Sequence, residues 1–282
     1  MPIRVYWADS QPRVDWCYLG DERFVDPFFA DTIERQLSLP FNLAFRYQTS
    51  LDDLIDLEKS HPGIPPSGFI FHMSRCGSTL VAQMLAALPT NLVVSEPEPI
   101  DGILRTRQIP GISDEQRLRW LTAMLSALAR PRIGERHFFV KFDSWHIFDL
   151  ALIRKAYPEV PWIFLYREPI EVMMSHRKQM GSQMIPGTLP LDILASNQRS
   201  PLDLSLEEYG ARVLAAFCEA ALAQRDRQGW LVNYQDLPEL VWTDLASHFR
   251  LPLNSAEIKC MRVAAQTDAK SPPFPFVDDS FE

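Results

Sequence analysis

A run of small polar residues follows a short apolar segment in the first third of the chain. The apolar segment is FIFH at residues 69–72, and the polar run is SRCGST at residues 74–79. When such a loop joins a strand to a helix, its backbone N–H groups and the helix N-terminus converge and favour a bound phosphate or sulfate. The sequence therefore predicts an anion-binding loop at residues 74–79.

This loop departs from the ATP- and GTP-binding pattern GxxxxGK[ST]. With Gly77 as the second glycine, His72 stands in place of the first, and Ser78 stands in place of the lysine, so that Thr79 alone agrees. No GK[ST] triplet occurs elsewhere in the sequence. The positive charge lies upstream instead, at Arg75. A P-loop nucleotide-dependent kinase or phosphotransferase, which needs that lysine, is accordingly the alternative interpretation.

A second candidate anion site follows a later apolar run. PWIFLY at residues 161–166 leads into Arg167, and Ser175 lies eight positions further on. If a helix begins with Pro169 in its first turn, Ser175 lies about two turns into it, on the same side as the arginine. A forked guanidinium and a hydroxyl placed in this way can bind one anion together.

The two loops together resemble those of the sulfotransferase superfamily that uses 3′-phosphoadenosine-5′-phosphosulfate (PAPS). RCGST at 75–79 is similar to the RSGTT or RSGST loop that binds the 5′-phosphosulfate, and the segment from Arg167 to Ser175 is similar to the loop that binds the 3′-phosphate. VNYQDL at 232–237 looks like the VRYEDL strand and turn of this family. The resemblance covers residues 68–234, is nearest to the bacterial and tyrosylprotein-type branch, and leaves residues 1–66 unmatched.

The resemblance implies an activity, a co-substrate and a set of binding residues. The activity is transfer of a sulfuryl group from PAPS to a hydroxyl or amine of an acceptor that the sequence does not identify. No metal is expected, because the transferred group carries less charge than a triphosphate. A relative that binds the nucleotide without catalysis is a further alternative. The implied PAPS-binding residues, the last by its placement alone, are Arg75, Cys76, Gly77, Ser78, Thr79, Arg167, Ser175 and Lys270.

Three residues are candidates for the chemistry itself. Arg75 would stabilise charge on the departing phosphate, and Lys141, at the end of HFFVKF, would assist it. Glu96 lies 21 residues after Arg75, a spacing similar to that of the tyrosylprotein branch, and would take the proton of the acceptor. Glu98 and Asp143 are alternative bases. Asp143 stands where small-molecule relatives carry the histidine of a KTH segment, and it is expected instead to cap the helix that follows.

Three other side chains near these positions are interpreted as structural. His72 is expected to be a hydrogen-bonded strand residue and His146 a residue on a helix face. Cys76 is expected to be a small packing residue, although a thiol beside an arginine could also be acidic and prone to oxidation.

These candidates follow apolar segments that alternate with helical ones. FIFH, NLVVSE, HFFVKF and PWIFLY are predicted as buried strands, and WLVNY as a fifth. The alternation predicts a three-layer α/β fold with a central parallel sheet, similar to P-loop NTPases. The break HPGIPPS divides an N-terminal cap or arm of uncertain fold, residues 1–66, from a sulfotransferase-like domain, residues 67–282. Residues 180–204 lose periodicity and are predicted as a lid-like insertion.

Composition excludes several classes of partner. The formal net charge of −8 and the pI of about 5.3 give no general attraction to nucleic acid or to an anionic membrane. No window reaches the roughly 18 apolar residues of a membrane span, and the N-terminus lacks a secretory pattern. The four cysteines form no CxxC pair. We therefore expect a cytoplasmic protein that acts on a small-molecule or conjugated hydroxyl acceptor, with its oligomeric state open.

Overall fold

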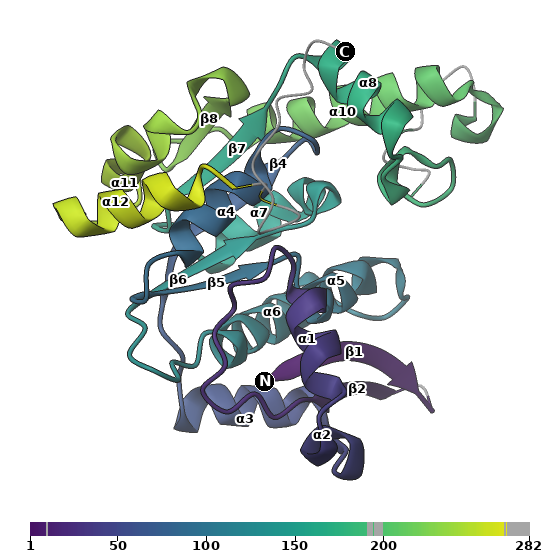
Figure 1. Ribbon diagram of the computed structural model, residues 1–282. Helices are drawn as coiled ribbons and strands as arrows, with labels where there is room; N and C mark the ends of the chain where they lie inside the picture. The colour runs from purple at the N-terminus through teal and green to yellow at the C-terminus, as the bar shows by residue number, and fades with distance from the viewer. Residues whose placement is uncertain (10, 191–193, 195–199, 268, 270–282) are drawn as a thin grey trace.

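The computed structural model describes residues 1–9, 11–190, 194, 200–267 and 269, and its centre is a five-stranded parallel sheet (Figure 1). The strand order is β5-β6-β4-β7-β8, and every neighbouring pair is parallel. The predicted α/β class and all five predicted strands are confirmed. Their bounds are β4 (Pro66–His72), β5 (Asn91–Ser95), β6 (His137–Lys141), β7 (Trp162–Tyr166) and β8 (Gly229–Asn233).

The inner strands are buried on both faces, which explains why their sequences are continuous apolar runs. Phe69, Ile70 and Phe71 of β4 are all fully buried, so side chains that point to opposite faces are equally covered. The covering and following helices are α4 (Ser78–Ala86), α5 (Glu98–Leu104), α6 (Asp114–Leu128), α7 (Leu150–Ala156), α8 (Pro169–Lys178), α10 (Leu206–Ala223), α11 (Asp244–His248) and α12 (Ser255–Ala264). Short 3-10 turns join them at η1 (Arg105–Gln108), η2 (Ser144–Asp149), η3 (Ser182–Met184), η4 (Pro201–Asp203), η5 (Tyr234–Asp236) and η6 (Glu239–Trp242).

The strand order makes the carboxyl end of β4 the switch point of the sheet, because the strands on its two sides are reached by connections that run in opposite directions. From β4 the chain passes over to β5 at one edge, returns to β6, and then crosses to β7 on the other side of β4. In open α/β sheets, ligands bind at such a switch point, beyond the carboxyl ends of the strands. The predicted anion loop, which leaves β4 at His72, lies at this point.

The described residues before β4 include a second, smaller sheet, which packs against the main one through helices. β1 (Pro2–Ala8), β2 (Gln11–Trp16) and β3 (Tyr47–Ser50) are antiparallel, and α1 (Phe29–Leu37), α2 (Pro40–Ala44) and α3 (Leu51–Ser60) accompany them. β1 contacts α5, and α3 contacts α6. The approach to α5 is close, because a Cβ added at Gly102 would lie 2.9 Å from the Cβ of Val5. A domain boundary at residue 66 stays a prediction.

Two predicted features lie wholly or partly outside the described residues. Lys270 is outside them, and so is part of the predicted lid-like insertion at 180–204. The described part of that insertion contains η3 and η4. None of the helices in the described part of the chain has the length and apolar character needed to cross a bilayer.

Candidate active site

The loop between β4 and α4 has the strand, loop and helix arrangement predicted for it, and its backbone is unusual. Ser74, Arg75 and Gly77 have φ angles of 76°, 51° and 82°. Left-handed conformations are uncommon for residues other than glycine and gather at functional sites. At Gly77 a side chain would also collide, since its Cβ would lie 2.7 Å from Leu237 Cδ1. The loop is thus bent tightly around the start of α4.

Side chains of this loop are bound to the segment that follows α8. The Arg75 guanidinium donates to the carbonyl oxygen of Gln179 at 2.7 Å and to its Oε1 at 3.2 Å. The Gln183 amide donates to Ser74 Oγ at 2.8 Å. The structure therefore brings Arg75 to the same side of the sheet as the second predicted anion site.

Cys76, Ser78 and Thr79 are buried in this loop and the first turn of α4. The Cys76 thiol donates to the carbonyl oxygen of Leu165 at 3.1 Å, and burial raises the pKa of this thiol to about 12. The alternative interpretation of Cys76 as an acidic, oxidisable thiol is therefore wrong. The expectation that it is a packing residue is confirmed.

The neighbouring ends of β5 and β6 carry a buried ion pair. The Glu96 carboxylate contacts Lys141 Nζ, and the Glu96 N–H donates to the carbonyl oxygen of Lys141 at 2.7 Å. Lys141 is fully buried, with Nζ 5.0 Å from the centroid of the Phe28 ring. Burial opposes the charge of Glu96, but the Lys141 ammonium and a hydrogen bond from His72 hold the pKa of this carboxyl well below its usual range. Glu96 and Lys141, predicted separately, thus act as one unit.

His72 connects this ion pair to the anion loop. Its Nδ1 accepts a hydrogen bond from the Ser74 N–H at 3.1 Å, so Nε2 carries the proton. Nε2 lies 3.0 Å from the carbonyl oxygen of Phe142 and 3.4 Å from Glu96 Oε1. Burial lowers the pKa of His72 and keeps the imidazole neutral. The expectation of a hydrogen-bonded strand residue is confirmed.

Arg167 lies at the end of β7, next to β4. Its guanidinium lies over the Tyr234 ring, 4.3 Å from the centroid, and its Nε donates to Glu171 Oε2 at 2.6 Å. Tyr234 begins the turn after β8, so the predicted VNYQDL segment reaches the site. Ser175 is half-buried in α8, as expected. Joint binding of one anion by Arg167 and Ser175 stays a prediction.

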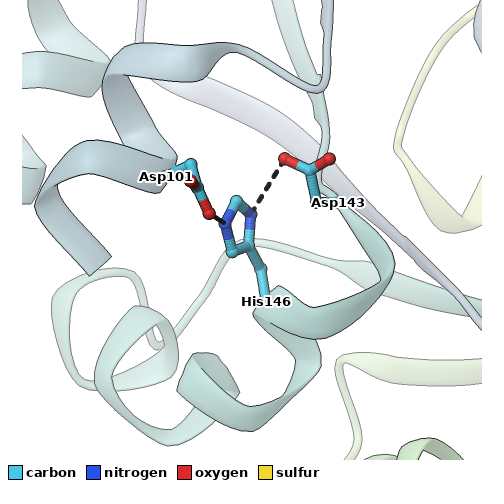
Figure 2. Close-up of side chains that lie close together, drawn as sticks. All are labelled: Asp101, Asp143 and His146. Carbon is cyan, nitrogen blue, oxygen red and sulfur yellow. Dashed lines mark hydrogen bonds and ion pairs between the residues drawn. The ribbon is translucent and has the colours of Figure 1, made fainter. Parts of the chain in front are cut away.

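A third group of charges consists of Asp101, Asp143 and His146 (Figure 2). The charges of Glu96 and Lys141 act on Asp143, so this group lies near the ion pair. His146 Nε2 lies 2.9 Å from Asp101 Oδ1, and Nδ1 lies 3.7 Å from Asp143 Oδ2. Trp145 Nε1 also donates to Asp101 Oδ1, at 2.7 Å. Asp143 does occupy the position that precedes η2, but its carboxylate makes no capping hydrogen bond and turns to His146 instead. The expected capping role is therefore wrong.

The sequence interpretation placed His146 on a helix face and left Asp101 unnamed. His146 is 1% exposed and lies between two carboxylates. The D-x-x-H spacing from Asp143 to His146 puts both side chains on one turn, and that signal could have identified two of the three residues of the cluster. Asp101 carried no such signal, because its position depends on how α5 packs.

Glu98, the other alternative base, faces a different part of the molecule. It is exposed at the start of α5. Burial raises the pKa of its carboxyl, and the charges that act on it are those of Arg4, Asp101 and Asp15. Arg4 and Asp15 belong to the N-terminal sheet, so Glu98 is directed toward that sheet.

Comparisons with known proteins find distant likenesses among solved structures. No family model matches the sequence, and no curated protein matches it. The sulfotransferase domain of the Synechococcus PCC 7002 olefin synthase is similar, with a TM-score of 0.47 and 16% identity over 76% of this chain and 82% of that one. Mouse sulfotransferase SULT7A1 complexed with PAP has a TM-score of 0.38 and 10% identity over 77% of this chain and 72% of its own. A sugar kinase from Janibacter sp. HTCC2649 has a TM-score of 0.35 and 16% identity, over 65% and 94%.

Proposed function

We propose that this chain transfers a sulfuryl group from PAPS to a hydroxyl or amine of an acceptor. The observation that carries the proposal is the gathering of three cations at the carboxyl ends of adjacent strands, around a tightly bent loop. Arg75 follows β4, Lys141 ends β6 and Arg167 follows β7. A donor with anionic groups at both ends requires cations at separated positions.

Each cation has a proposed task. Arg75, with the loop residues Cys76 to Thr79, binds the 5′-phosphosulfate, and Arg167 with Ser175 binds the 3′-phosphate. Lys141 stabilises the negative charge that develops on the departing phosphate oxygen. Its ammonium is buried and fixed by Glu96, so little reorganisation is needed during the reaction. Lys270, outside the described residues, is proposed as a further contact to the 3′-phosphate.

A P-loop kinase is the second candidate, since it shares the fold and the helix N-terminus at the anion loop. Ser78 stands where such an enzyme carries its phosphate-binding lysine, and that difference disfavours a triphosphate. The buried cation is supplied instead by Lys141, from another strand. A relative that binds the nucleotide without catalysis is the third candidate, and it would have no use for a buried ammonium at this position.

Calorimetric titration of the full chain, without added metal, distinguishes these candidates. Adenosine 3′,5′-bisphosphate is expected to bind at least about tenfold more tightly than ADP or ATP, because Arg167 adds a charge-assisted contact to the 3′-phosphate. Arg167→Ala should weaken binding of the bisphosphate by about 10–100-fold and leave that of ADP little changed. Arg177→Ala is the matched control, because Arg177 lies on α8 with its side chain 74% exposed. Tighter, Mg²⁺-dependent binding of ATP would favour the kinase.

The acceptor and the compartment belong to the same proposal. We place the reaction in the cytoplasm, and all four cysteines, Cys17, Cys76, Cys218 and Cys260, are free thiols, as is usual for a reducing compartment. The acceptor is a small molecule or a conjugated hydroxyl. Incubation with sulfur-35-labelled PAPS and a metabolite extract would identify the labelled product.

A further inference from the structure

Asp101, His146 and Asp143 form a chain of ionisable groups that starts two residues after Lys141. Figure 2 shows the imidazole between the two carboxylates, each facing a different ring nitrogen. Asp101 comes from α5, and Asp143 and His146 come from the segment that follows β6. The cluster thus begins at the carboxyl end of β6, where the proposed reaction takes place.

The cluster is suited to handling a proton rather than a metal ion. Its three ligand atoms lie within 4.8 Å of one another. An ion bound at Nδ1 beside Asp143 would nevertheless leave Asp101 on the far side of the ring, where it already accepts hydrogen bonds from Nε2 and from Trp145. A carboxylate near each ring nitrogen favours the protonated form of an imidazole.

The charges around Asp143 determine its protonation. His146 and Lys141 face it as cations, and Glu96 and Asp101 face it as anions. Burial raises the pKa of the Asp143 carboxyl to about 7, and the nearby anions add to this. Although burial opposes it, the hydrogen bond to Asp101 and the charge of Asp143 raise the pKa of His146, with a contribution from Asp149. Burial and the neighbouring charges therefore raise the pKa of the Asp143 carboxyl, and the two flanking carboxylates raise that of the His146 imidazole against the effect of its burial.

One atom of the cluster lacks a hydrogen-bond partner. Among the described residues, His146 Nδ1 is buried and makes no hydrogen bond, since Asp143 Oδ2 is 3.7 Å away. A small displacement of the Asp143 carboxyl toward the ring would close this gap. The Nδ1 atom of His146 therefore faces the Asp143 carboxyl, which lies two residues after the end of β6.

We infer that Asp143 is the residue that takes the proton of the acceptor, and that His146, held by Asp101, is the positioning residue that keeps this carboxylate charged and aimed. The inference rests on the proposed sulfuryl transfer and gives the reaction its missing base. The sequence instead predicts Glu96 to be the base. That expectation stays a prediction, and the experiments below test both residues.

The reaction balances with Asp143 in this role. The acceptor oxygen forms its bond to sulfur as the bond from sulfur to the phosphate oxygen breaks, and the departing phosphate keeps that electron pair. The O–H bond of the acceptor breaks at the same time, and its proton moves to an Asp143 oxygen. The products are the sulfated acceptor, adenosine 3′,5′-bisphosphate and one protonated carboxyl, which then returns its proton to water.

The protonated cluster has an outlet to the surface. Asp101 and His146 border a groove that is also lined by Arg105, Arg107, Trp145 and Thr188. The groove gives a proton of the cluster a route to solvent. Glu96 lacks these features, because its carboxylate is already compensated by Lys141 and is a weak base.

The first test compares Asp143→Asn with Glu96→Gln, using sulfur-35-labelled PAPS with a set of alcohols and phenols and with water alone. We expect Asp143→Asn to lower turnover about 10²–10⁴-fold, the usual contribution of a general base, with affinity for adenosine 3′,5′-bisphosphate unchanged. Glu96→Gln should lower turnover less than about tenfold, since it loses a charge that only fixes Lys141. The inference would be overturned if Asp143→Asn kept half of the wild-type turnover. It would also be overturned if Glu96→Gln lowered turnover more than Asp143→Asn does.

The second test reads the protonation directly and needs no acceptor. Asp143 is titrated by carbon-13 NMR of aspartate-labelled protein, with Asp143→Asn to assign its signal. His146→Gln keeps an N–H for Asp101 but removes the positive charge, so the Asp143 midpoint should rise by on the order of one pH unit. The acid limb of the turnover profile should move upward equally. An unchanged midpoint would refute the role of His146.

The proposed function and the inference about Asp143 would be contradicted by different results. If the wild-type chain neither binds the bisphosphate nor transfers sulfur from PAPS, the proposed function is wrong, yet the titration still shows whether the cluster behaves as a unit. If the wild type transfers sulfur and Asp143→Asn does so equally, only the inference is wrong. Circular dichroism of each variant separates loss of fold from loss of a proton acceptor.

Discussion

Two half-buried carboxylates, Glu96 after β5 and Asp143 after β6, lie near each other, and their surroundings give them opposite properties. Glu96 contacts an ammonium, which lowers the pKa of its carboxyl. Asp143 contacts an imidazole from 3.7 Å and lies near two other carboxylates, and the pKa of its carboxyl rises to about 7. The same functional group is thus a fixed charge in one place and a proton acceptor in the other. The distance to the nearest cation decides which.

Removal of the Lys141 ammonium should abolish the difference in pKa between Glu96 and Asp143, and it should have the largest effect on turnover. Lys141→Met keeps the apolar stem and deletes the charge, so turnover is expected to fall by about 10²–10³-fold. Glu96 would then be a buried carboxylate without its cation, and its pKa should rise above its usual value. Carbon-13 titration of glutamate-labelled protein measures that rise, and Lys178→Met, on the exposed part of α8, is the control. A Glu96 midpoint unchanged in Lys141→Met would contradict the comparison.

The pH dependence of the free energy of unfolding should show the same difference between Asp143 and Glu96. The expected effect is smaller than that of removing the Lys141 ammonium. The Asp143 pKa is raised by folding, so its contribution is fully present below pH of about 4 and is lost as the pH rises through about 7. Asp143→Asn should therefore stabilise the fold above pH 7 by on the order of 2 kcal/mol, and change it little at pH 4. Urea unfolding at the two values measures this.

Glu96 has the opposite sign and serves as the internal control for that experiment. Its pKa is lowered by folding, so its contribution is present above its unfolded value, about 4.3, and is lost as the pH falls. Glu96→Gln should therefore destabilise the fold at neutral pH and less so in acid. Parallel pH profiles for the two variants would contradict the assignment of opposite environments.

The smallest expected effect is that of metal removal. Asp101, Asp143 and His146 are proposed to hold a proton, so dialysis against EDTA should leave turnover within about twofold of the untreated chain. Added Zn²⁺ should not restore or increase it. A loss of activity that Zn²⁺ repairs, together with a changed histidine signal in the NMR spectrum, would identify the cluster as a metal site instead.

Much of the fold could be predicted because the strands of a parallel sheet are buried on both faces. FIFH, NLVVSE, HFFVKF and PWIFLY are therefore continuous apolar runs that are visible without a structure. The antiparallel sheet at the N-terminus was not predicted. Its strands carry exposed charges such as Arg4 and Arg13, which hide the apolar pattern.

Candidate residues could be named from sequence where one segment supplies them. Arg167 stands directly after a strand, and Arg75 and Gly77 lie in the loop that joins β4 to α4. The ion pair between Glu96 and Lys141 depends on the pairing of β5 with β6, and Asp101 depends on the packing of α5. Such contacts join residues about 45 positions apart, so neither local spacing nor residue type indicates them.

The aromatic ring that Phe28 places over Lys141 ties the first part of the chain to the chemistry. The ring shields the ammonium from water and so strengthens its charge. Gly102, next to Asp101, meanwhile lets β1 approach α5 closely. The N-terminal region therefore covers one side of the proposed site, and a chain cut at the proline-rich break would keep Arg75, Lys141 and Arg167 yet lose the Phe28 ring that lies over the buried lysine.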